Sequence, residues 1–439
     1  MDTHRQEESS LSTALVKVAI VGCGARGSIY SNYALISNRM KVVAIADRQE
    51  ARRRRMQKDH TLPGEHCYDS WEGLLEAPKT ADAVIICVID CLHKDVAVAF
   101  ADKGYHILLE KPMSTDLASC QEVYNAAKRN SVLLAVCHVL RYTPYNRKIK
   151  EIVDSGALGD VVGIQHLEPV GHYHFAHSYV RGSWRNEAES SFSLMTKSCH
   201  DIDIITYFLG DDCKRVSSFG GISHFKKEKK PSRAGDAIRC IDCNYESQCP
   251  YSAKKIYLEP AKAGVKDWPL DVVADVVDIE NITDALRTGP YGRCVYECDN
   301  DVCDNQVVNM EFEGNRFASF SMVAFTKELC VRKTRIFGTR GELIGDGESS
   351  IEVFDFLNQK STYHSPDPVS EQLSGHGGGD MGIIKSFVEA VSSNDPTKLP
   401  SNGLSSFNSH VIVFAAEEAR RRGTVISMNE FCTQNGLEF

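Results

Sequence analysis

A lysine, a histidine and an aspartate recur at every third position in the segment that contains Lys197, His200 and Asp203. The apolar residues around them predict a helix over 194–205, and this spacing would place the three side chains along one side of it. There a carboxylate orients the imidazole, and a neighbouring ammonium lowers its proton affinity. The pattern predicts acid/base chemistry at His200, with a buried structural histidine as the alternative.

A second lysine, Lys111, lies between Glu110 and Pro112, directly after an apolar run that predicts a buried strand. Open α/β sheets bind their ligands beyond the carboxyl ends of the strands. We therefore expect this turn to direct the ammonium of Lys111 into a cleft, and a plain surface turn is the alternative.

Residues 22–27 read GCGARG and follow the apolar run 15–21, so a GxGxxG pattern lies between a predicted strand and a predicted helix. Its glycines allow a tight turn, close approach of the backbone to a pyrophosphate and close helix packing. The predicted dinucleotide contacts in this loop are Gly22, Gly24, Ala25, Arg26 and Gly27.

Asp47 ends a second apolar run, 41–46, twenty residues beyond Gly27. A carboxylate at this place accepts hydrogen bonds from a ribose 2′-hydroxyl, which favours NAD. Arg48 and the arginines at 52–55 offer partners for a 2′-phosphate, although such a run is more often solvated. The cofactor is therefore NAD or NADP, with NAD favoured.

The elements that must position these residues alternate along the first third of the chain. Predicted strands at 15–21, 41–46, 83–88, 105–109 and 132–137 alternate with predicted helices at 93–103 and 116–129. This alternation predicts a doubly wound parallel sheet. His93 begins its helix just after a strand end, which predicts a cofactor contact, with a simple polar helix start as the alternative.

Five motifs occur in an order typical of one enzyme family. They are GCGARG at 22–27, ADR at 46–48, EKP at 110–112, HVLRY at 138–142 and SGALG at 155–159. In this order they resemble the Gfo/Idh/MocA oxidoreductases. The resemblance implies that Glu110, Lys111, His138 and Arg141 also belong to the cofactor site, that Lys111 contacts both nicotinamide ribose and substrate, and that the Lys111-Pro112 bond is similar to one often cis in that family.

The resemblance also implies an α/β plus α+β fold, in which a Rossmann domain precedes a domain with an open antiparallel sheet that often mediates oligomers. We expect a disordered tail at 1–14, the Rossmann domain at 15–140 and the α+β substrate and oligomerisation domain at 141–439. An amphipathic helix at 402–422 is expected to pack back on the Rossmann domain. The predicted assembly is a homodimer or homotetramer.

The helix with His200 departs from the family pattern at one position. The resemblance leads one to expect an acidic residue four positions before the histidine, but this chain has Thr196 there, followed by Lys197. The departure suggests a subfamily in which Lys111 and Lys197 surround His200.

Aromatic and polar residues of the segment 171–186 suit a hydroxylated ring. Tyr179 belongs to an aromatic stretch that we expect to be a loop, and Trp184 with Arg185 offers an indole face and a bidentate guanidinium. An aromatic core anchor beside a surface salt bridge is the alternative. His376, in a glycine-rich segment, is a further candidate for substrate binding, whereas Asp380 is expected to cap a helix.

An insert over 223–300 carries a cluster of cysteines. Cys240 and Cys243 form a CxxC pair and Cys249 follows six positions later, so that His224 could complete a structural zinc site. Loop cysteines without metal, or a redox pair, are the alternatives. The second group, Cys294, Cys298 and Cys303, looks incidental because its spacing is loose.

The amino-acid composition limits the classes of binding partner that we expect. The chain of 439 residues has 50 Lys and Arg against 59 Asp and Glu, and this net charge of −9 argues against nucleic acid or an anionic membrane surface as partner. No apolar run approaches the length of a membrane helix, and the 16 cysteines are expected to be reduced thiols, so we expect a cytoplasmic protein.

Together these features predict hydride transfer between NAD(P) and a secondary alcohol of a sugar, glycoside or cyclitol. His200 would take the hydroxyl proton, Lys111 would lower the pKa of that hydroxyl, Lys197 would tune His200 or bind substrate, and Asp203 would orient the imidazole. An NAD-dependent glycoside hydrolase and a non-catalytic nucleotide-binding protein are the alternatives.

Overall fold

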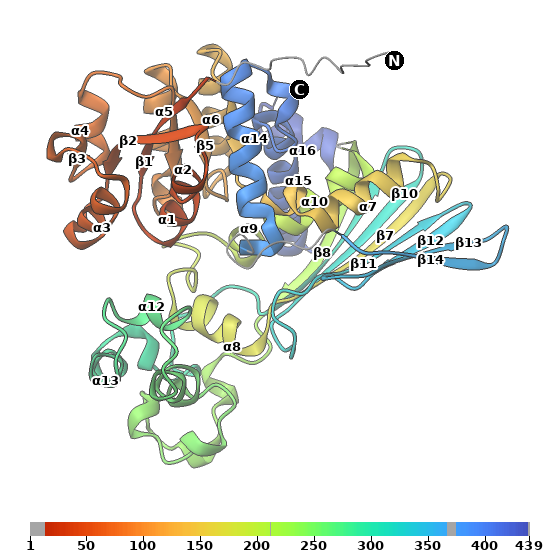
Figure 1. The fold of residues 1–439 in the computed structure, drawn as a ribbon. Coiled ribbons are helices and arrows are strands. Elements are labelled where there is room, and N and C mark those ends of the chain that lie inside the picture. Colours follow the sequence, from red (N-terminus) through yellow and green to blue (C-terminus); the bar gives the residue numbers. More distant parts are fainter. Residues whose placement is uncertain (1–13, 211, 367–374, 438–439) are drawn as a thin grey trace, which may run out of the picture. The chain divides into compact units, whose positions relative to one another are not determined.

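The computed structural model describes residues 14–210, 212–366 and 375–437, which form two compact units (Figure 1). Of these residues, the first unit comprises 14–148 and 375–408, and the second comprises 149–366, without 211, and 409–437. Apart from Ala14, the tail expected at 1–14 lies outside the described residues.

The first unit contains a six-stranded sheet of order β3-β2-β1-β4-β5-β6, in which every pair is parallel. Its strands are β1 (Val16–Val21), β2 (Met40–Ala46), β3 (Cys67–Tyr68), β4 (Ala83–Ile86), β5 (His106–Leu109) and β6 (Leu134–Val136). Nearly continuous apolar runs form β1, β2 and β4 because helices cover both faces of such a sheet. The predicted doubly wound sheet is confirmed.

The helices of this unit follow the strands in alternation. They are α1 (Ala25–Ser31), α2 (Tyr33–Ile36), α3 (Glu50–His60), α4 (Trp71–Glu76), α5 (His93–Asp102) and α6 (Leu117–Arg129), and α14 (Gly379–Ser393) joins them from much later in the chain. Ile383, Ile384 and Phe387 of α14 pack into the core formed by β1 and β2. The region 375–408, which we expected in the second domain, therefore belongs to the first unit, because its apolar face is buried there.

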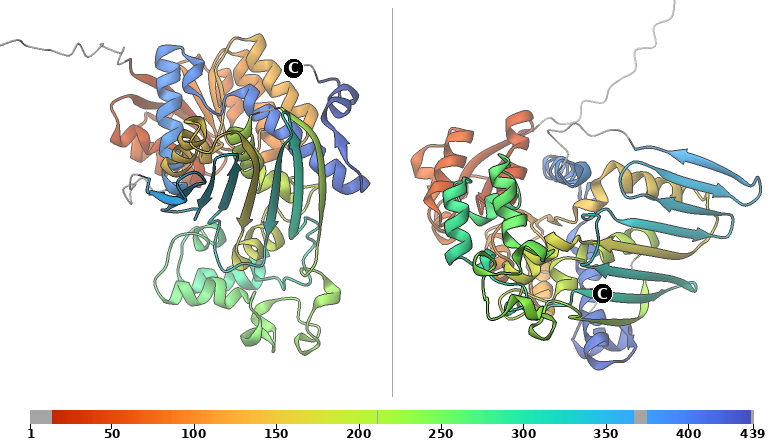
Figure 2. Two further views of the ribbon diagram at one scale, coloured as in Figure 1. Left: turned by 90° about the vertical axis from the view of Figure 1, so that its right-hand side faces the viewer. Right: turned by 90° about the horizontal axis from the view of Figure 1, so that it is seen from below.

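The second unit contains a nine-stranded sheet of order β14-β13-β12-β11-β7-β10-β9-β8-β15 (Figure 2). Its strands are β7 (Val161–Pro169), β8 (Cys213–Gly221), β9 (Asn305–Phe312), β10 (Arg316–Val323), β11 (Lys333–Gly338), β12 (Gly341–Gly345), β13 (Ile351–Asp355), β14 (Lys360–His364) and β15 (Ile426–Ser427). All neighbours are antiparallel except β7 and β10, which are parallel. The sheet is therefore mixed rather than purely antiparallel, because no hairpin links β7 to β10 and fixes their directions.

Apart from those between β8 and β9, the helices of the second unit precede β7, lie between β7 and β8, or follow β14. They are α8 (His172–Phe175), a π-helical stretch (Ala176–Arg181), α9 (Ser193–Thr196), α10 (Cys199–Leu209), the end of α7 (Pro144–Asp154), most of α15 (Gly403–Arg422) and α16 (Met428–Gln434). The segment 171–179 was expected to be a loop, but nearly all of it is helical. Its aromatic side chains are instead held by packing on a helix.

The helix predicted over 194–205 is broken in the middle. Lys197 caps the C-terminus of α9 and Ser198 caps the N-terminus of α10, so Lys197 and His200 do not share one regular helix. The regular spacing that placed Lys197, His200 and Asp203 on a single helix side therefore does not apply to Lys197. Helix α10 itself lies against β7 and β10, on one face of the sheet (Figure 1).

Residues 222–304 leave the sheet between β8 and β9. They form α11 (Glu259–Lys262), α12 (Leu270–Val273), α13 (Ile279–Thr288) and several short 3-10 and π turns. These helices have a small core of their own, which contains Cys240, Ala253, Ile256, Tyr257, Leu270, Ile282 and Leu286. Gly221 and Asn305 are paired across β8 and β9, so the insert leaves and rejoins the sheet at neighbouring positions.

Among the residues that the structure describes, no helix combines the length and the apolar character needed to cross a membrane.

Candidate active site

The GCGARG turn joins β1 to α1 and depends on glycine at two positions. Gly22 has a φ of +95°, and a Cβ there would lie 2.3 Å from the carbonyl oxygen of Cys87. A Cβ on Gly27 would lie 2.0 Å from the carbonyl oxygen of Gly22. Only glycine fits either place, which is the backbone geometry expected of a dinucleotide-binding turn.

Asp47 lies at the end of β2 and holds the turn from the side. One carboxylate oxygen accepts a hydrogen bond from the Cys23 N–H at 2.7 Å, and the other accepts one from the Gln49 N–H at 2.7 Å. Each oxygen keeps a further lone pair, so Asp47 still has acceptor capacity for ribose hydroxyls. These residues fit an adenosine ribose.

The arginines around Asp47 have different surroundings. Arg53 donates to the carbonyl oxygens of Asp47 and Arg48, and Arg55 donates to that of Cys23, so both support the backbone of the turn. The Arg48 side chain is exposed.

The EKP turn is tied to the GCGARG turn by an ion-pair cluster within the first unit. Arg26 Nε lies 2.5 Å from Glu110 Oε1, and Arg26 Nη2 lies 2.6 Å from Asp380 Oδ1. The Tyr30 hydroxyl donates to Glu110 at 2.7 Å, and His376 Nδ1 lies 3.0 Å from Asp380 Oδ2. The predicted cofactor residues Arg26 and Glu110 and the predicted substrate residue His376 thus belong to one cluster.

The ion pairs and hydrogen bonds of this cluster lower the pKa values of its two buried carboxyl groups. Burial by itself raises the pKa of Glu110, but Arg26 and Tyr30 outweigh it, so that this pKa lies below its usual value. Burial likewise opposes the ionisation of Asp380, and His376 with Arg26 brings its pKa below the usual range. Asp380 is therefore an ion-pair partner in the first turn of α14 and not the expected helix cap, which is Gly378.

Lys111 is half-buried in the EKP turn, and the Lys111-Pro112 peptide is cis, as the resemblance implied. The backbone N–H of Lys111 donates to Glu110 Oε2 at 2.9 Å. Beneath the turn, His93 is fully buried, with Nδ1 2.7 Å from the Pro112 carbonyl oxygen and Nε2 3.2 Å from that of Val88. These contacts describe His93 as a support for the turn, and its predicted cofactor contact stays a prediction.

His138 and Arg141 are buried where β6 ends. His138 has no exposed surface, and burial, with the charges of Arg141 and Lys111 in addition, lowers its pKa well below the usual value. Arg141 donates to the carbonyl oxygen of Pro400 at 2.8 Å. His138 is thus held neutral, while Arg141 anchors the chain that follows α14.

In the second unit, His200 lies in the first turn of α10 with 7% of its surface exposed. Asp203, one turn later, is fully buried and accepts a hydrogen bond from the Ser409 hydroxyl at 3.0 Å. Lys197 Nζ lies 2.8 Å from Glu168 Oε1. The sequence did not point to Glu168, because no motif links a strand residue to a lysine that lies far along the chain.

The aromatic candidates for substrate binding pack on one another. Tyr179 is 3% exposed and stacks on Phe175 at 5.0 Å and on Trp184 at 6.0 Å between ring centroids. This stack favours the alternative of an aromatic core anchor for Tyr179 and Trp184.

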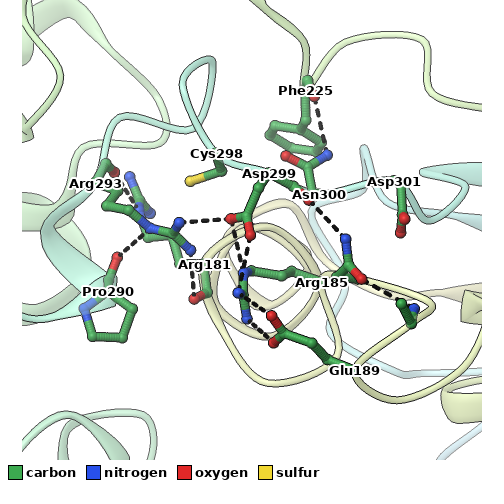
Figure 3. Close-up of polar contacts among 12 residues, drawn as sticks. Arg181, Arg185, Glu189, Phe225, Pro290, Arg293, Cys298, Asp299, Asn300 and Asp301 are labelled. Atoms are coloured by element: carbon green, nitrogen blue, oxygen red, sulfur yellow. Dashed lines mark hydrogen bonds and ion pairs between the residues drawn. The ribbon is translucent and has the colours of Figure 1, made fainter.

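Arg185 lies between two carboxylates (Figure 3). Its Nη1 lies 2.8 Å from Glu189 Oε2 and its Nε lies 2.9 Å from Asp299 Oδ1. Arg293 also pairs with Asp299, at 2.6 Å. Since these contacts occupy most of the donors of its guanidinium, Arg185 serves to fasten the insert, as the salt-bridge alternative expected.

The sequence did not identify Trp268, a tryptophan of the insert, as a candidate for substrate binding. Trp268 is 38% exposed and meets His174 and His177 edge to face, at 4.9 Å and 5.3 Å between ring centroids. His174 Nδ1 in turn lies 3.4 Å from the Cys330 sulfur, which Lys197 Nζ approaches to 3.1 Å. An exposed indole close to the buried lysine is a better stacking candidate than Trp184, but only the fold brings the two regions together.

The cysteines of the insert gather differently from the expected set. Cys240, Cys243, Cys249 and Cys294 line one small pocket, so Cys294 is not incidental. His224, the expected fourth ligand, has its Nε2 3.0 Å from the Tyr296 hydroxyl. Over the described ranges, no three His, Cys, Asp or Glu side chains are arranged to hold a metal ion, and the zinc site stays a prediction.

Arg181 anchors this pocket. It has no exposed surface and donates to the carbonyl oxygens of Arg293 at 2.8 Å and Tyr251 at 2.7 Å, as well as to the Cys240 sulfur. All three acceptors belong to the insert, so Arg181 holds the insert to the helical segment before α9.

Two family patterns match the chain. The pattern described as "Oxidoreductase family, NAD-binding Rossmann fold" matches residues 16–138, and the one described as "Oxidoreductase family, C-terminal alpha/beta domain" matches residues 150–428.

Relatives and solved structures agree with these patterns. The chain is 25% identical to a putative oxidoreductase, YteT, of Bacillus subtilis over 72% of this chain and 74% of that protein. It is 26% identical to myo-inositol 2-dehydrogenase of Thermotoga maritima over 52% of this chain and 64% of that protein. A crystal structure of an oxidoreductase from Agrobacterium radiobacter, in complex with NAD+, L-tartaric acid and magnesium, shares the fold with a TM-score of 0.68 at 15% identity, covering 94% of this chain and 99% of that one.

Proposed function

Because the chain belongs to the Gfo/Idh/MocA oxidoreductase family, with an NAD-binding Rossmann domain, we propose that it is a dehydrogenase acting on a secondary alcohol of a cyclitol or sugar. The observation that carries this proposal is the nearly buried imidazole of His200 in the first turn of α10, within a segment of buried ionisable residues. A titratable group in such surroundings suits proton transfer to or from a hydroxyl.

The residues of the first unit fit a dinucleotide. The turn at 22–27 offers backbone approach to a pyrophosphate, and Asp47 offers acceptors to a ribose. A bound nicotinamide would supply the two-electron redox chemistry. Lys111 would then lower the pKa of the substrate hydroxyl through its positive charge.

In the second unit, His200 would take the hydroxyl proton during oxidation and return it during reduction. Asp203 would orient the imidazole, and Lys197 would act through its charge. Trp268 would offer its indole to the apolar face of a ring.

Myo-inositol 2-dehydrogenase among the relatives supports a cyclitol or sugar as substrate. The test is an assay of the purified chain against myo-inositol, scyllo-inositol and a panel of aldoses and sugar acids, with NAD and NADP separately. The expected result is a change of nicotinamide absorbance in proportion to the oxidised alcohol.

The same assay separates the alternatives. Release of a leaving group from a glycoside without net change of nicotinamide absorbance would indicate the NAD-dependent glycoside hydrolase instead. Tight cofactor binding without turnover over the whole panel would contradict both enzymes and favour the nucleotide-binding protein.

A further inference from the structure

Strand β7 contributes a buried carboxylate to the neighbourhood of Lys197. Glu168 has no exposed surface, with Oε1 2.8 Å from Lys197 Nζ and Oε2 3.1 Å from Arg332 Nε. Both cations are themselves mostly buried, with 10% and 13% of their side-chain surface exposed. Glu168 is therefore the carboxylate that pairs with Lys197.

The alternation of β7 explains why Glu168 reaches this place. Ile164, His166 and Glu168 are buried at alternate positions, while Gln165 between them is exposed, and α10 lies against this strand. Because the helix breaks between Lys197 and Ser198, Lys197 is released from the regular path of α10. The side chain of Lys197 can then extend to Glu168.

The pair belongs to a balanced cluster. Arg332 Nε also lies 2.7 Å from Asp201 Oδ1, and His166 Nε2 lies 3.2 Å from the same oxygen. Two carboxylates thus face two permanent cations in a buried region. Removal of one member leaves an uncompensated charge, which is far more costly than the net value of the pair.

Five ionisable groups act on the charge of Lys197. They are Glu168 on β7, Tyr179 in the π-helical stretch, Asp201 on α10, and Cys330 and Arg332 in the segment before β11. Burial, the largest influence, lowers the pKa of Lys197, and Arg332 acts in the same direction. Glu168 together with Cys330 and Tyr179 outweighs both, so the pKa lies above its usual value. Lys197 is therefore a permanent ammonium and cannot serve as the base.

Thr196 occupies the position where the resemblance led us to expect an acid, four residues before His200. We propose that Glu168 is a positioning residue that holds Lys197 as a fixed cation for the reaction at His200, and so replaces the missing acid from a neighbouring strand. In this role the fixed positive charge favours loss of the proton from the substrate hydroxyl, which His200 would accept. This inference rests on the proposed dehydrogenase function.

The first test is the pH profile of Glu168→Gln, which keeps the shape of the side chain and removes its charge. Lys197 is then left beside the like charge of Arg332, so its pKa falls and the ammonium is lost at alkaline pH. We expect a new alkaline limb in the pH profile of kcat. Along this limb, above the lowered pKa of Lys197, kcat falls about tenfold for each pH unit, while the KM for NAD is unchanged.

The matched control is Glu342→Gln, which removes the carboxylate of the partly exposed pair between Arg335 and Glu342 in the same unit. We expect this variant to keep the wild-type profile. Glu168→Asp retains the charge on a shorter side chain and should lack the new alkaline limb. An unchanged kcat and profile in folded Glu168→Gln would overturn the inference, as would lower stability alone.

A double variant covers the case in which Glu168→Gln does not fold. Glu168→Gln with Lys197→Met removes both partners, which is milder for folding than removal of one. Arg332 keeps Asp201 as its partner. We expect a folded chain that binds NADH but has lost turnover, whereas a purely structural pair predicts that turnover persists.

A measurement without turnover separates this inference from the proposed function. In a chain labelled with 13C and 15N at the lysine ε-carbon and ζ-nitrogen, the Lys197 signal is assigned by its absence in Lys197→Arg and is followed with pH. We expect this signal to stay in its protonated form at pH values where the same signal in Glu168→Gln titrates. Equal titration in both chains would overturn the role of Glu168, whatever the substrate assays give.

Discussion

Arg26, at a variable position of the glycine-rich turn, pairs with carboxylates from two other segments. Its guanidinium pairs with Glu110 from the EKP turn and with Asp380 from α14, and both carboxylates are nearly buried. Arg26 thus links three segments of the first unit, and its predicted cofactor contact stays a prediction. Loss of Arg26 should therefore lower the stability of the fold more than it lowers the rate of the reaction.

We expect Arg26→Met to lower the free energy of unfolding by about 3 kcal/mol at pH 7, because it leaves two buried carboxylates without their cation. The pKa values of Glu110 and Asp380 lie below their usual range in the folded chain, so their ionisation stabilises it above the unfolded pKa of about 4. This contribution disappears as the pH falls through the folded values. The difference between variant and wild type should therefore shrink towards acid pH.

Urea unfolding at neutral and acid pH measures this difference. The control is Arg54→Met, which breaks the exposed i,i+4 pair of Arg54 with Glu50 and should cost at most about 0.5 kcal/mol. An Arg26→Met penalty that is as small as this control, or that is independent of pH, would contradict the importance of the cluster.

His200→Ala tests the acid/base assignment. We expect kcat to fall by roughly two to four orders of magnitude, with the affinity for NADH unchanged, because the proton of the hydroxyl loses its acceptor. The control is His364→Ala, at the end of strand β14 in the same sheet. A loss of less than about threefold in steady-state kcat would remove His200 from the mechanism.

Asp47→Asn tests the ribose contact. The amide oxygen can accept from only one of the Cys23 and Gln49 N–H groups, and the charge is lost. We therefore expect the dissociation constant for NADH to rise about tenfold and that for NADPH to rise less. Asp59→Asn, on the exposed side of α3, is the control. Equal changes for the two cofactors, measured by fluorescence titration, would show that Asp47 does not discriminate between them.

At the scale of the elements, the sequence predicted what local patterns determine. The glycines at 22 and 27, the apolar strands and the acid after β2 lie in one stretch of chain, and their spacing alone predicted the sheet and its turn. The break between Lys197 and Ser198 could not be predicted in this way, because Lys197 pairs with a carboxylate on another element. The same limit applied to Trp184 and Arg185, whose partners come from distant segments.

Metal analysis can test whether the insert binds the zinc ion that its cysteines predict. Metal analysis of the purified chain should find about one zinc per chain if Cys240, Cys243 and Cys249 bind it, and Cys294→Ser should then lower the content more than His224→Ala, since Cys294 lines the same pocket. A chain without stoichiometric metal would contradict the prediction and leave four reduced thiols around Arg181.

At the scale of the whole molecule, one face of the nine-stranded sheet offers a surface for assembly. Phe219, Val307 and Phe317 are 66%, 39% and 54% exposed at positions that alternate with buried residues of β8, β9 and β10. Exposed apolar side chains on a broad sheet are typical of an interface. This face carries the prediction of a homodimer or homotetramer.

We expect light scattering to give the mass of a dimer or tetramer for the wild-type chain and a lower mass for Phe317→Arg, which places a charge in that face. Leu357→Arg, at the exposed turn between β13 and β14, is the control. A wild-type chain that is monomeric would contradict the prediction, as would an unchanged mass for Phe317→Arg.

Because Gly221 pairs with Asn305, a short turn could replace the insert between them. Two ends held at adjacent positions of an antiparallel pair can be closed by a two-residue Asn-Gly turn, and the entropy of loop closure changes only slowly with length. Removal of the insert would also remove the hydrogen-bond acceptors of the buried Arg181 guanidinium, which all belong to the insert. A graft between relatives should therefore carry matching acceptors or replace Arg181 with a neutral side chain.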